Sequence, residues 1–437
     1  GPNGLKELVG ACHTRGLAVA LDVVYNHLGP EGNYLAEFGP YFTDRYRTPW
    51  GQAINFDGAE SDEVRRFFIE NALYWTKEFH IDALRLDAIH AIVDPSARPI
   101  LEELGVAVHQ QARQLKRKIH VIAESDRNDS RIIRAREAGG YGLDAQWSDD
   151  FHHALHTLLT PERNGYYKDF GAVEQLAVAC REGFVYSGQY SVYRKRRHGN
   201  SSLGLPPEQF VVFAQNHDQV GNRLLGERLS QLVSFDALKV AAGAVLLSPY
   251  IPLLFMGEDY GETAPFMYFV SHSDPELIEA VRNGRQEEFA AFDWAGKIPD
   301  PQSAATFEIC KLNHDLKAGG DHQTLYNFVR ELIRLRKGVP ALSWNCHAEK
   351  ETIAFEKEKL LWLRRWQSGA QAVIIFNFGN KPATAEFPFP KGRFSRTLDS
   401  ADQKWNGRGS LCPDLLEADG NASLTMAACS LVLFKSN

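Results

Sequence analysis

No stretch of the 437 residues approaches the run of about 18 apolar residues that a membrane-spanning helix needs, so we expect no membrane span. The six cysteines form no C-x-x-C pair, which disfavours a zinc site or a disulfide framework and favours a cytoplasmic location. Basic charge is not in excess either: 48 Lys and Arg stand against 55 Asp and Glu, a net charge of −7, which argues against a nucleic-acid partner. These absences leave a multidomain globular protein, and its 44% hydrophobic content is enough for a sizeable core.

The first two-thirds of the chain alternate short apolar runs with longer helical patterns. We expect strands within residues 17–25, 83–87, 120–124, 143–147, 210–216 and 251–256. This alternation is typical of βα units that build a parallel sheet. A barrel and a doubly wound sheet share the pattern, but the sequence has no Gly-x-Gly-x-x-Gly turn, which weighs against a nucleotide-binding sheet.

The pattern changes after a helical stretch that ends near Lys337. Short alternating strands follow, with turn residues such as Gly379 and Asn380 between them, and they predict an all-β region. We therefore predict a domain of βα units over residues 1–340, with a helical insertion around residues 262–330. A C-terminal β-sandwich is predicted over residues 345–437.

Four acidic residues lie at or near the carboxyl ends of predicted strands: Asp22, Asp87, Glu124 and Asp218. Buried parallel strands are normally apolar on both faces, so a charge there needs a reason. One such acid could be a satisfied structural residue or a helix cap. Four buried together would repel one another and cost stability. Because the carboxyl ends of parallel strands carry the chemistry in both α/β architectures, we interpret the four acids as an active site.

Paired carboxylates acting on an uncharged substrate suggest glycoside hydrolysis. One carboxylate attacks the sugar carbon, and a protonated partner donates to the departing oxygen. Arg85 shares a strand face with Asp87 and would keep that carboxylate ionised and oriented. Repulsion from Asp218 would help to keep Glu124 protonated at neutral pH.

Histidines and aromatic residues near these acids agree with a sugar site. His27, His90 and His217 follow strand-end acids and are suited to donate hydrogen bonds to sugar hydroxyls. A His/Asp metal site is the alternative, but these three histidines form no H-x-H or H-x-x-x-H pair. Aromatic side chains in the loops, such as Trp50 and Trp147, would stack on pyranose rings.

Four segments, in this order along the chain, resemble the motifs of the α-amylase clan of glycoside hydrolases. They are Asp22–His27, Arg85–His90, Ala123–Ser125 and Asn216–Gln219. Each motif is short and weak alone, but four in order at strand ends are a strong signal. Within the clan, segments such as residues 29–34 and 144–153 look most similar to the maltooligosyltrehalose trehalohydrolases, and the similarity runs over nearly the whole chain.

The resemblance implies a TIM-type (β/α)8 barrel and a retaining hydrolase that needs no cofactor. It implies Asp87 as the nucleophile, Glu124 as the general acid/base and Asp218 as the transition-state stabiliser. Such enzymes cleave the α-1,4 bond next to the terminal trehalose of maltooligosyltrehalose and release trehalose. The residues expected to bind the substrate are Asp22, His27, Trp50, Arg85, His90, Asp149, Asp150, His152, His217, Gln219, Asn222 and Arg223.

Two departures from the clan's pattern matter. Many α-amylases carry a Lys-His pair three and four residues after the nucleophile; here these positions are His90 and Ala91, which argues against an ordinary α-amylase. The sequence also opens in the helix before the barrel's third strand, so we expect a fragment of a longer protein that lacks the first two strands. A glucan-branching transferase of the same clan and a non-catalytic carbohydrate-binding protein are the alternative functions, and the oligomeric state stays open.

Overall fold

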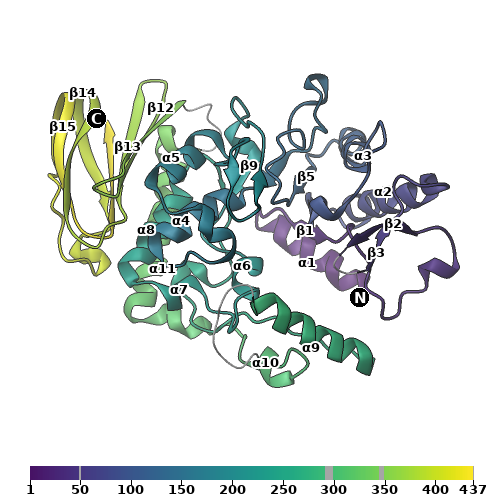
Figure 1. Cartoon of the computed structure of the whole chain (residues 1–437). Coiled ribbons are helices and arrows are strands. Elements are labelled where there is room, and N and C mark those ends of the chain that lie inside the picture. The colour runs from purple at the N-terminus through teal and green to yellow at the C-terminus, as the bar shows by residue number, and fades with distance from the viewer. Residues whose placement is uncertain (49–50, 291–298, 344–348, 437) are drawn as a thin grey trace. The chain divides into compact units, whose positions relative to one another are not determined.

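The computed structural model describes residues 1–48, 51–290, 299–343 and 349–436, and the chain divides into two compact units (Figure 1). Unit 1 comprises Gly1–Ser148 and Gly199–Ser201, and unit 2 comprises Asp149–His198 and Ser202–Asn437. The all-β C-terminal region is a distinct sheet inside unit 2, so the predicted domain limits at residues 340 and 345 stay a prediction.

Unit 1 is built around four parallel strands, hydrogen bonded in the order β1-β4-β5-β6. All four strands lie within the runs that the sequence predicts, because each is a short apolar segment between polar ends. Its helices and strands are α1 Pro2–Thr14, β1 Ala20–Val23, β2 Phe42–Thr48, β3 Gly51–Ile54, α2 Ser61–Glu78, β4 Ala83–Leu86, α3 Ile100–Leu115, β5 His120–Ala123 and β6 Ala145–Trp147.

The register of this sheet brings two predicted site residues to the same level. Leu86 of β4 is aligned with Ala123 of β5, so Asp87 and Glu124 both follow directly at the carboxyl edge. The ladder continues one step further, because Glu124 N donates to Leu86 O at 3.0 Å. Neighbouring strands lie ~4.8 Å apart, so the two carboxylates start from adjacent points of the backbone.

Acidic residues also stand at the amino ends of two strands, where they hold the sheet together. Asp144, just before β6, accepts hydrogen bonds from Val121 N at 2.7 Å and from His109 Nε2 at 2.8 Å, and His120 Nδ1 lies 3.4 Å from its other oxygen. Asp82 makes the same kind of contacts before β4, with a backbone N–H next to β1 and a histidine of α1. Each acid therefore joins the start of one strand to the start of its neighbour.

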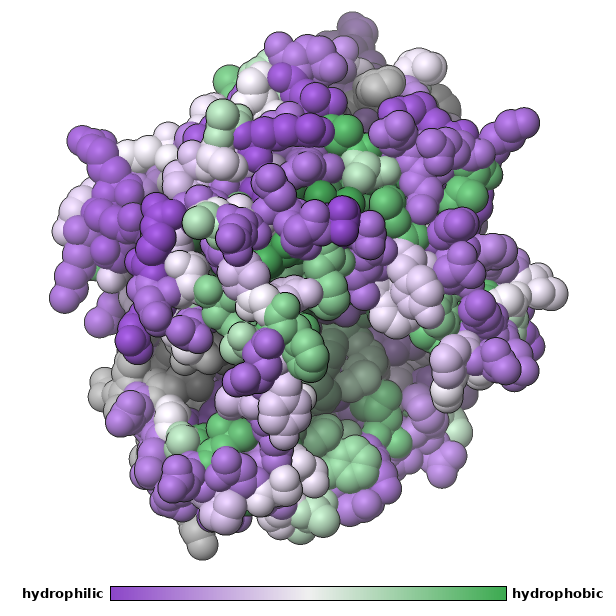
Figure 2. All heavy atoms as spheres, turned by 90° about the vertical axis from the view of Figure 1, so that its right-hand side faces the viewer, coloured by the Kyte–Doolittle hydropathy of each residue, from purple (hydrophilic) through white to green (hydrophobic). Residues whose placement is uncertain are grey.

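The segment after β1 contains an antiparallel hairpin, β2–β3, that the sequence did not predict. Its strands are mostly polar, so they show no apolar run. In the same segment Tyr34 is 70% exposed and Phe38 is 81% exposed. Figure 2 looks onto the side of the molecule that carries this hairpin, and the face is largely hydrophilic with apolar groups in small separate patches.

Unit 2 begins with helices and a short parallel pair, β9 with β10, and both strands lie in predicted runs. Helices α9 and α10 and the first part of α11 lie in the region predicted as a helical insertion. Across the described part of the chain, no helix is long and apolar enough to cross a membrane. The elements are α4 Asp149–Leu159, α5 Val173–Glu182, β7 Tyr190–Ser191, β8 Arg196–Arg197, β9 Phe210–Val212, α6 His217–Gly221, α7 Leu229–Leu232, α8 Phe235–Leu246, β10 Ile251–Pro252, α9 Pro275–Ala290, α10 Ala304–Glu308 and α11 Gly320–Gly338.

The C-terminal strands form one antiparallel sheet in the order β11-β12-β13-β16-β14-β15, which confirms the all-β prediction. Helix α8 packs against β16. A Cβ at Gly243 of α8 would lie 2.1 Å from Leu431 Cδ2, so glycine permits this close approach. The strands are β11 Glu349–Phe355, β12 Leu360–Gln367, β13 Ala370–Asn377, β14 Ala383–Asp399, β15 Leu415–Met426 and β16 Ser430–Ser436.

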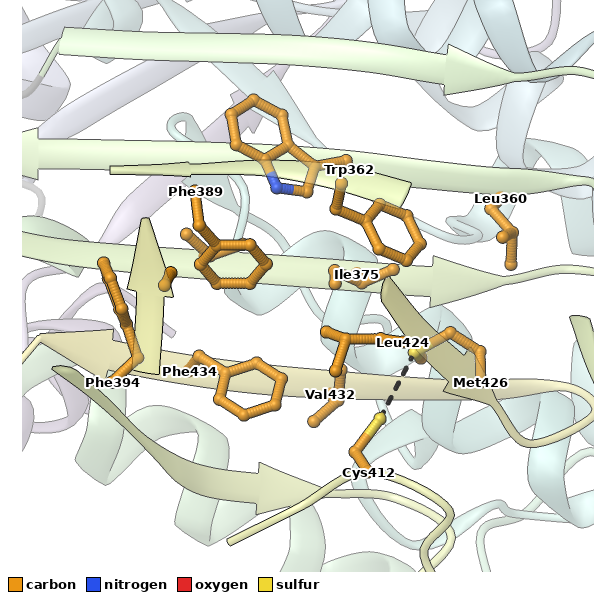
Figure 3. Close-up of a cluster of buried hydrophobic side chains, with 13 residues drawn as sticks. Leu360, Trp362, Ile375, Phe389, Phe394, Cys412, Leu424, Met426, Val432 and Phe434 are labelled. Atoms are coloured by element: carbon orange, nitrogen blue, oxygen red, sulfur yellow. Dashed lines mark hydrogen bonds between the residues drawn. The ribbon is translucent and has the colours of Figure 1, made fainter. Parts of the chain in front are cut away.

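One hydrophobic core holds this sheet together (Figure 3). Alternate residues of the strands point into it, including Trp362, Ile375, Phe389 and Phe434. Strand β14 pairs with β15 along most of its length and with β16 near its end, and each of the two pairings contains one register shift. The sheet is thus continuous in its hydrogen bonds, and the predicted β-sandwich stays a prediction.

We predict that Asp144→Asn destabilises the protein by about 2 kcal/mol near pH 5.5, where a charge-assisted hydrogen bond is lost. Burial by itself raises the pKa of Asp144, but the bonds from His109, His120 and Val121 N outweigh it and the pKa is lowered. This stabilisation is therefore present above the unfolded pKa of the carboxyl group and lost as pH falls towards the folded value. Urea unfolding at several pH values measures it.

The pH dependence of the stabilisation has the opposite sign for His120, a histidine partner of Asp144. The hydrogen bond to Asp144 raises the pKa of His120, so its contribution is full below the unfolded pKa and is lost as pH rises through the folded value. The deficit of Asp144→Asn should therefore be largest between about pH 4 and 6.5. Glu70→Gln, an exposed member of an ion pair on α2, is the control and should change stability by less than about 0.5 kcal/mol. A deficit that does not vary with pH would contradict this account.

Candidate active site

The guanidinium of Arg85 on β4 is the centre of the candidate site in unit 1, and Arg85 is only 4% exposed. Its Nη1 donates to Asp22 Oδ1 at 2.8 Å and to Asp87 Oδ1 at 2.6 Å. Its Nη2 lies 3.6 Å from Glu124 Oε2, and its Cζ lies 4.3 Å from the ring centroid of Trp147. Three of the four strand-end acids thus meet around one cation that packs on an indole ring.

Burial and charge act against each other on Arg85. Burial lowers its pKa, but the charges and hydrogen bonds of the three carboxylates outweigh burial, and the pKa of Arg85 is raised. The guanidinium therefore stays cationic throughout the range in which the protein is folded. In return, it offsets the repulsion that would otherwise separate three neighbouring carboxylates.

A side-chain amide holds Asp87 from the other side. Asn26, which is 1% exposed, donates through Nδ2 to Asp87 Oδ2 at 2.9 Å and to Asp87 O at 2.6 Å. Asn26 Oδ1 contacts His27 Nδ1. Burial lowers the pKa of His27, and the charge of Asp87 opposes this only in part, so the ring is neutral at pH 7. Asn26 was not among the expected site residues; the one signal for it is its place four residues after Asp22 in the first motif.

The backbone that follows Asp87 positions Glu124. Ala88 adopts a left-handed conformation, with φ 38° and ψ 49°, which is uncommon for a residue other than glycine. This turn directs Ala88 N to Glu124 Oε2, and the two atoms lie 2.5 Å apart. Ile89 N also donates to Glu124 O at 3.1 Å. The two residues that follow Asp87 in the chain therefore donate hydrogen bonds to Glu124.

Asp218 lies in unit 2, in the first turn of the short helix α6. Asn216 caps this helix: its Oδ1 accepts from Asp218 N at 2.9 Å, and its own N donates to Gln219 Oε1 at 3.0 Å. His217 Nε2 lies 3.5 Å from Asp218 Oδ1. This capping box makes the fourth motif one compact turn that presents an acid and a histidine.

The structure places His152, which was expected to bind the substrate, inside the protein, and its expected role stays a prediction. His152 is 1% exposed, and both of its ring nitrogens are used inside the protein. Nδ1 pairs with Ala214 O at 2.7 Å, and Nε2 pairs with the hydroxyl of Tyr167 at 2.9 Å. His152 therefore joins α4 to the segment after β9.

Arg223, also expected to bind the substrate, has partners inside the protein. Its two Nη atoms donate to Glu162 at 2.9 and 2.7 Å, and His156 Nε2 lies 2.8 Å from the same carboxylate. Burial raises the pKa of Glu162, but these partners outweigh burial and bring it to about 2. The guanidinium is thus held in an ion pair with Glu162, and its expected contact with the substrate stays a prediction. No pattern in the sequence points to Glu162 as its partner.

Other expected binding residues have partners that neither support nor exclude their predicted role. Asp150 is buried and accepts from the backbone N–H groups of residues 185 and 186 at 2.8 and 2.9 Å. Asn222 Oδ1 accepts from Arg285 Nη1 at 3.0 Å. Asp149 is the first residue of α4.

The remaining expectations concern His90, Trp50 and metals. His90 lies in the turn after Ala88, and its Nδ1 is 3.8 Å from Asp126 Oδ1. Trp50 lies outside the described residues. Within the described ranges, no group of three or more His, Cys, Asp or Glu side chains is arranged to hold a metal ion.

Comparison with known proteins agrees with this geometry. No sequence-family model matches the chain. A solved structure does: a Salmonella typhimurium protein classed as an alpha amylase is 35% identical with a TM-score of 0.84, and the match covers 100% of this chain and 70% of that one. The chain therefore belongs to the α-amylase clan of glycoside hydrolases.

Two curated relatives carry a more specific name than the clan. The malto-oligosyltrehalose trehalohydrolase of Saccharolobus solfataricus is 50% identical over 377 residues, which is 86% of this chain and 63% of that protein. The malto-oligosyltrehalose trehalohydrolase of Mycobacterium tuberculosis is 46% identical over 387 residues, 87% of this chain and 66% of that protein. The chain thus spans less than two-thirds of the length of these relatives.

We predict that Arg85→Gln lowers stability at pH 7 by about 2 kcal/mol, below the ~3–5 kcal/mol of a fully buried pair because Asp22 and Asp87 keep access to water. The deficit should shrink as pH is lowered to 4, since protonation relieves the repulsion among the carboxylates. Denaturant unfolding at the two pH values measures both quantities. Arg66→Gln, an exposed arginine on α2, is the control, and an equal deficit at both pH values would refute the charge-offset role.

Proposed function

We propose that this chain carries the catalytic centre of a retaining glycoside hydrolase that cleaves the α-1,4 bond next to the terminal trehalose of maltooligosyltrehalose and releases trehalose. The observation that carries this proposal is the pair of carboxylates around one guanidinium, Asp87 at 2.6 Å and Glu124 at 3.6 Å from Arg85. The substrate follows from the names of relatives that are 46% and 50% identical. The proposed partner is thus a neutral α-glucan that ends in trehalose.

In this mechanism Asp87 attacks the anomeric carbon of the sugar. The bond from that carbon to the glycosidic oxygen breaks, and Glu124 gives its proton to the departing oxygen. In the second step Glu124 takes a proton from water, which attacks the same carbon and releases Asp87. The contact with Arg85 favours the ionised form of Asp87 that this attack requires. The motif around Asp218 supports its role as the transition-state stabiliser.

The finer fold assignment belongs to the same proposal. We assign the parallel strands to a TIM-type (β/α)8 barrel, in which catalytic residues come from the carboxyl ends of several strands. The likeness to the Salmonella typhimurium structure supports this assignment. The domains over residues 1–340 and 345–437 and the cytoplasmic location are proposed with it.

A cavity in unit 1 is suited to the leaving trehalose. It has a volume of about 350 Å³, within the ~300–1,000 Å³ typical of small-molecule sites. Ile89 and His90, which follow the nucleophile, and Ser125, which follows the general acid, line it. A general acid protonates the departing oxygen, so the leaving group lies on its side of the broken bond.

The lining of this cavity fits a sugar. Isoleucine, leucine and valine side chains offer apolar contact for ring faces, and Arg131, Asp129 and Tyr141 offer polar groups for hydroxyls. The wall that contains Asp94 is rigid, because Asp94 Oδ2 accepts from Arg65 Nη1 at 2.7 Å and from the N-terminus of α3 at 2.6 Å. A preformed wall lowers the entropic cost of binding.

We predict that Asp87→Asn in the intact protein lowers trehalose release by about four orders of magnitude, because the amide cannot act as the nucleophile. Binding of maltooligosyltrehalose, measured by calorimetry, should persist. Asp419→Asn, an exposed acid on β15, is the matched control and should leave turnover unchanged. Unchanged turnover in Asp87→Asn would refute the nucleophile, and new α-1,6 links without free trehalose would indicate the transferase instead.

Tyr141→Ala should weaken recognition of the leaving trehalose. We expect the ratio of kcat/KM for maltooligosyltrehalose over a maltooligosaccharide of equal length to fall roughly tenfold, the equivalent of about 1.4 kcal/mol. Steady-state kinetics with the two substrates measure this ratio. Tyr74→Ala, which removes a half-exposed tyrosine of α2 outside the cavity, should leave it unchanged. A ratio that Tyr141→Ala does not alter would remove the cavity from the proposal.

A further inference from the structure

Each of the two oxygens of the Asp87 carboxylate accepts a hydrogen bond from a side chain. Arg85 Nη1 donates to Oδ1 at 2.6 Å, and Asn26 Nδ2 donates to Oδ2 at 2.9 Å. The terminal torsion of an aspartate is broad when it is not constrained, so one bond would leave the group free to turn. Two donors on opposite oxygens define the plane of the carboxylate.

The chemistry of its neighbours determines the direction of the Asn26 amide. Asp87 O and Asp87 Oδ2 only accept hydrogen bonds, so the amide nitrogen must face them. The amide oxygen then faces His27 Nδ1, which must carry a proton to donate to it. The flipped amide would set oxygen against two acceptors. Asn26 therefore links the His27 ring to the nucleophile in a single arrangement.

We propose that Asn26 is a positioning residue for the nucleophile: it fixes the torsion of the Asp87 carboxylate so that one oxygen is aimed at the anomeric carbon. This inference rests on the proposed function. Attack requires an aligned lone pair at about 3–3.5 Å from the carbon, and a misplacement of about 1 Å can cost 10²-fold in rate. The burial of Asn26, at 1% exposure, keeps water from replacing its two bonds.

A purely structural role is the competing explanation, since the bond from Asn26 to Asp87 O also joins the segment after β1 to the end of β4. The two roles differ in what an isosteric change does. Asn26→Asp keeps the shape but replaces the donor by a charged acceptor, whereas Asn26→Ala removes the donor and leaves a gap. A structural role makes alanine the worse variant, and a positioning role makes aspartate at least as harmful to kcat at neutral pH.

The experiment measures kcat and KM for trehalose release by the intact protein carrying Asn26→Ala or Asn26→Asp. We expect kcat to fall about 10²-fold in both at pH 7, with KM within about threefold of the wild type. Lowering the pH to 5 should restore part of the activity of Asn26→Asp relative to the wild type, because a protonated carboxyl regains one donor. Asn26→Ala should show no such recovery.

Asn71→Ala is the matched control, because Asn71 accepts a hydrogen bond from the hydroxyl of Tyr25, the residue next to Asn26, at 2.7 Å. It should lower stability and leave kcat unchanged. Wild-type kcat in Asn26→Ala, or recovery at pH 5 in both Asn26 variants, would overturn the positioning role. The Asp87→Asn variant separates the two proposals: its inactivity beside a fully active Asn26→Ala refutes only the present inference, whereas its activity refutes the proposed nucleophile.

Discussion

In unit 1 the buried guanidinium of Arg85 and three carboxylates stabilise one another. Arg85 alone at 4% exposure would be too costly to keep charged, and its carboxylate partners alone would repel each other. The acids converge because their strands are adjacent in the sheet, and the cation supplies the charge that lets them remain there.

Asp87 and Glu124, the proposed nucleophile and general acid, are held by different kinds of donor. Asp87 is bound by two side chains, from Arg85 and Asn26, while Glu124 is bound by the backbone N–H of Ala88. Because Ala88 directly follows Asp87, a shift of one carboxylate moves the donor of the other. The left-handed conformation of Ala88 costs of order 1–3 kcal/mol, and the contact with Glu124 is what this turn achieves.

The strands could be predicted because an apolar run is a local pattern, and Asp87 and Glu124 could be predicted because each directly follows such a strand. Partners distant in sequence could not. His152 and Arg223 have the right residue types in the right motifs, yet their polar atoms are used by Tyr167 and Glu162. Spacing along the chain does not encode which buried group a side chain will meet. The polar hairpin β2–β3 was missed because its pairing, not an apolar run, defines its strands.

Strand direction separates the acids that join neighbouring strands from the acids that we propose to react. At the amino ends, Asp82 and Asp144 each accept a backbone N–H of a neighbouring strand and a histidine, so their oxygens are occupied in joining the sheet. At the carboxyl ends, Asp87 and Glu124 converge on Arg85 beside a cavity of about 350 Å³. Acid side chains at the two edges of one sheet thus have different roles. Loops at the carboxyl edge can vary around a substrate while the hydrogen bonds that join the strands at the amino edge are kept.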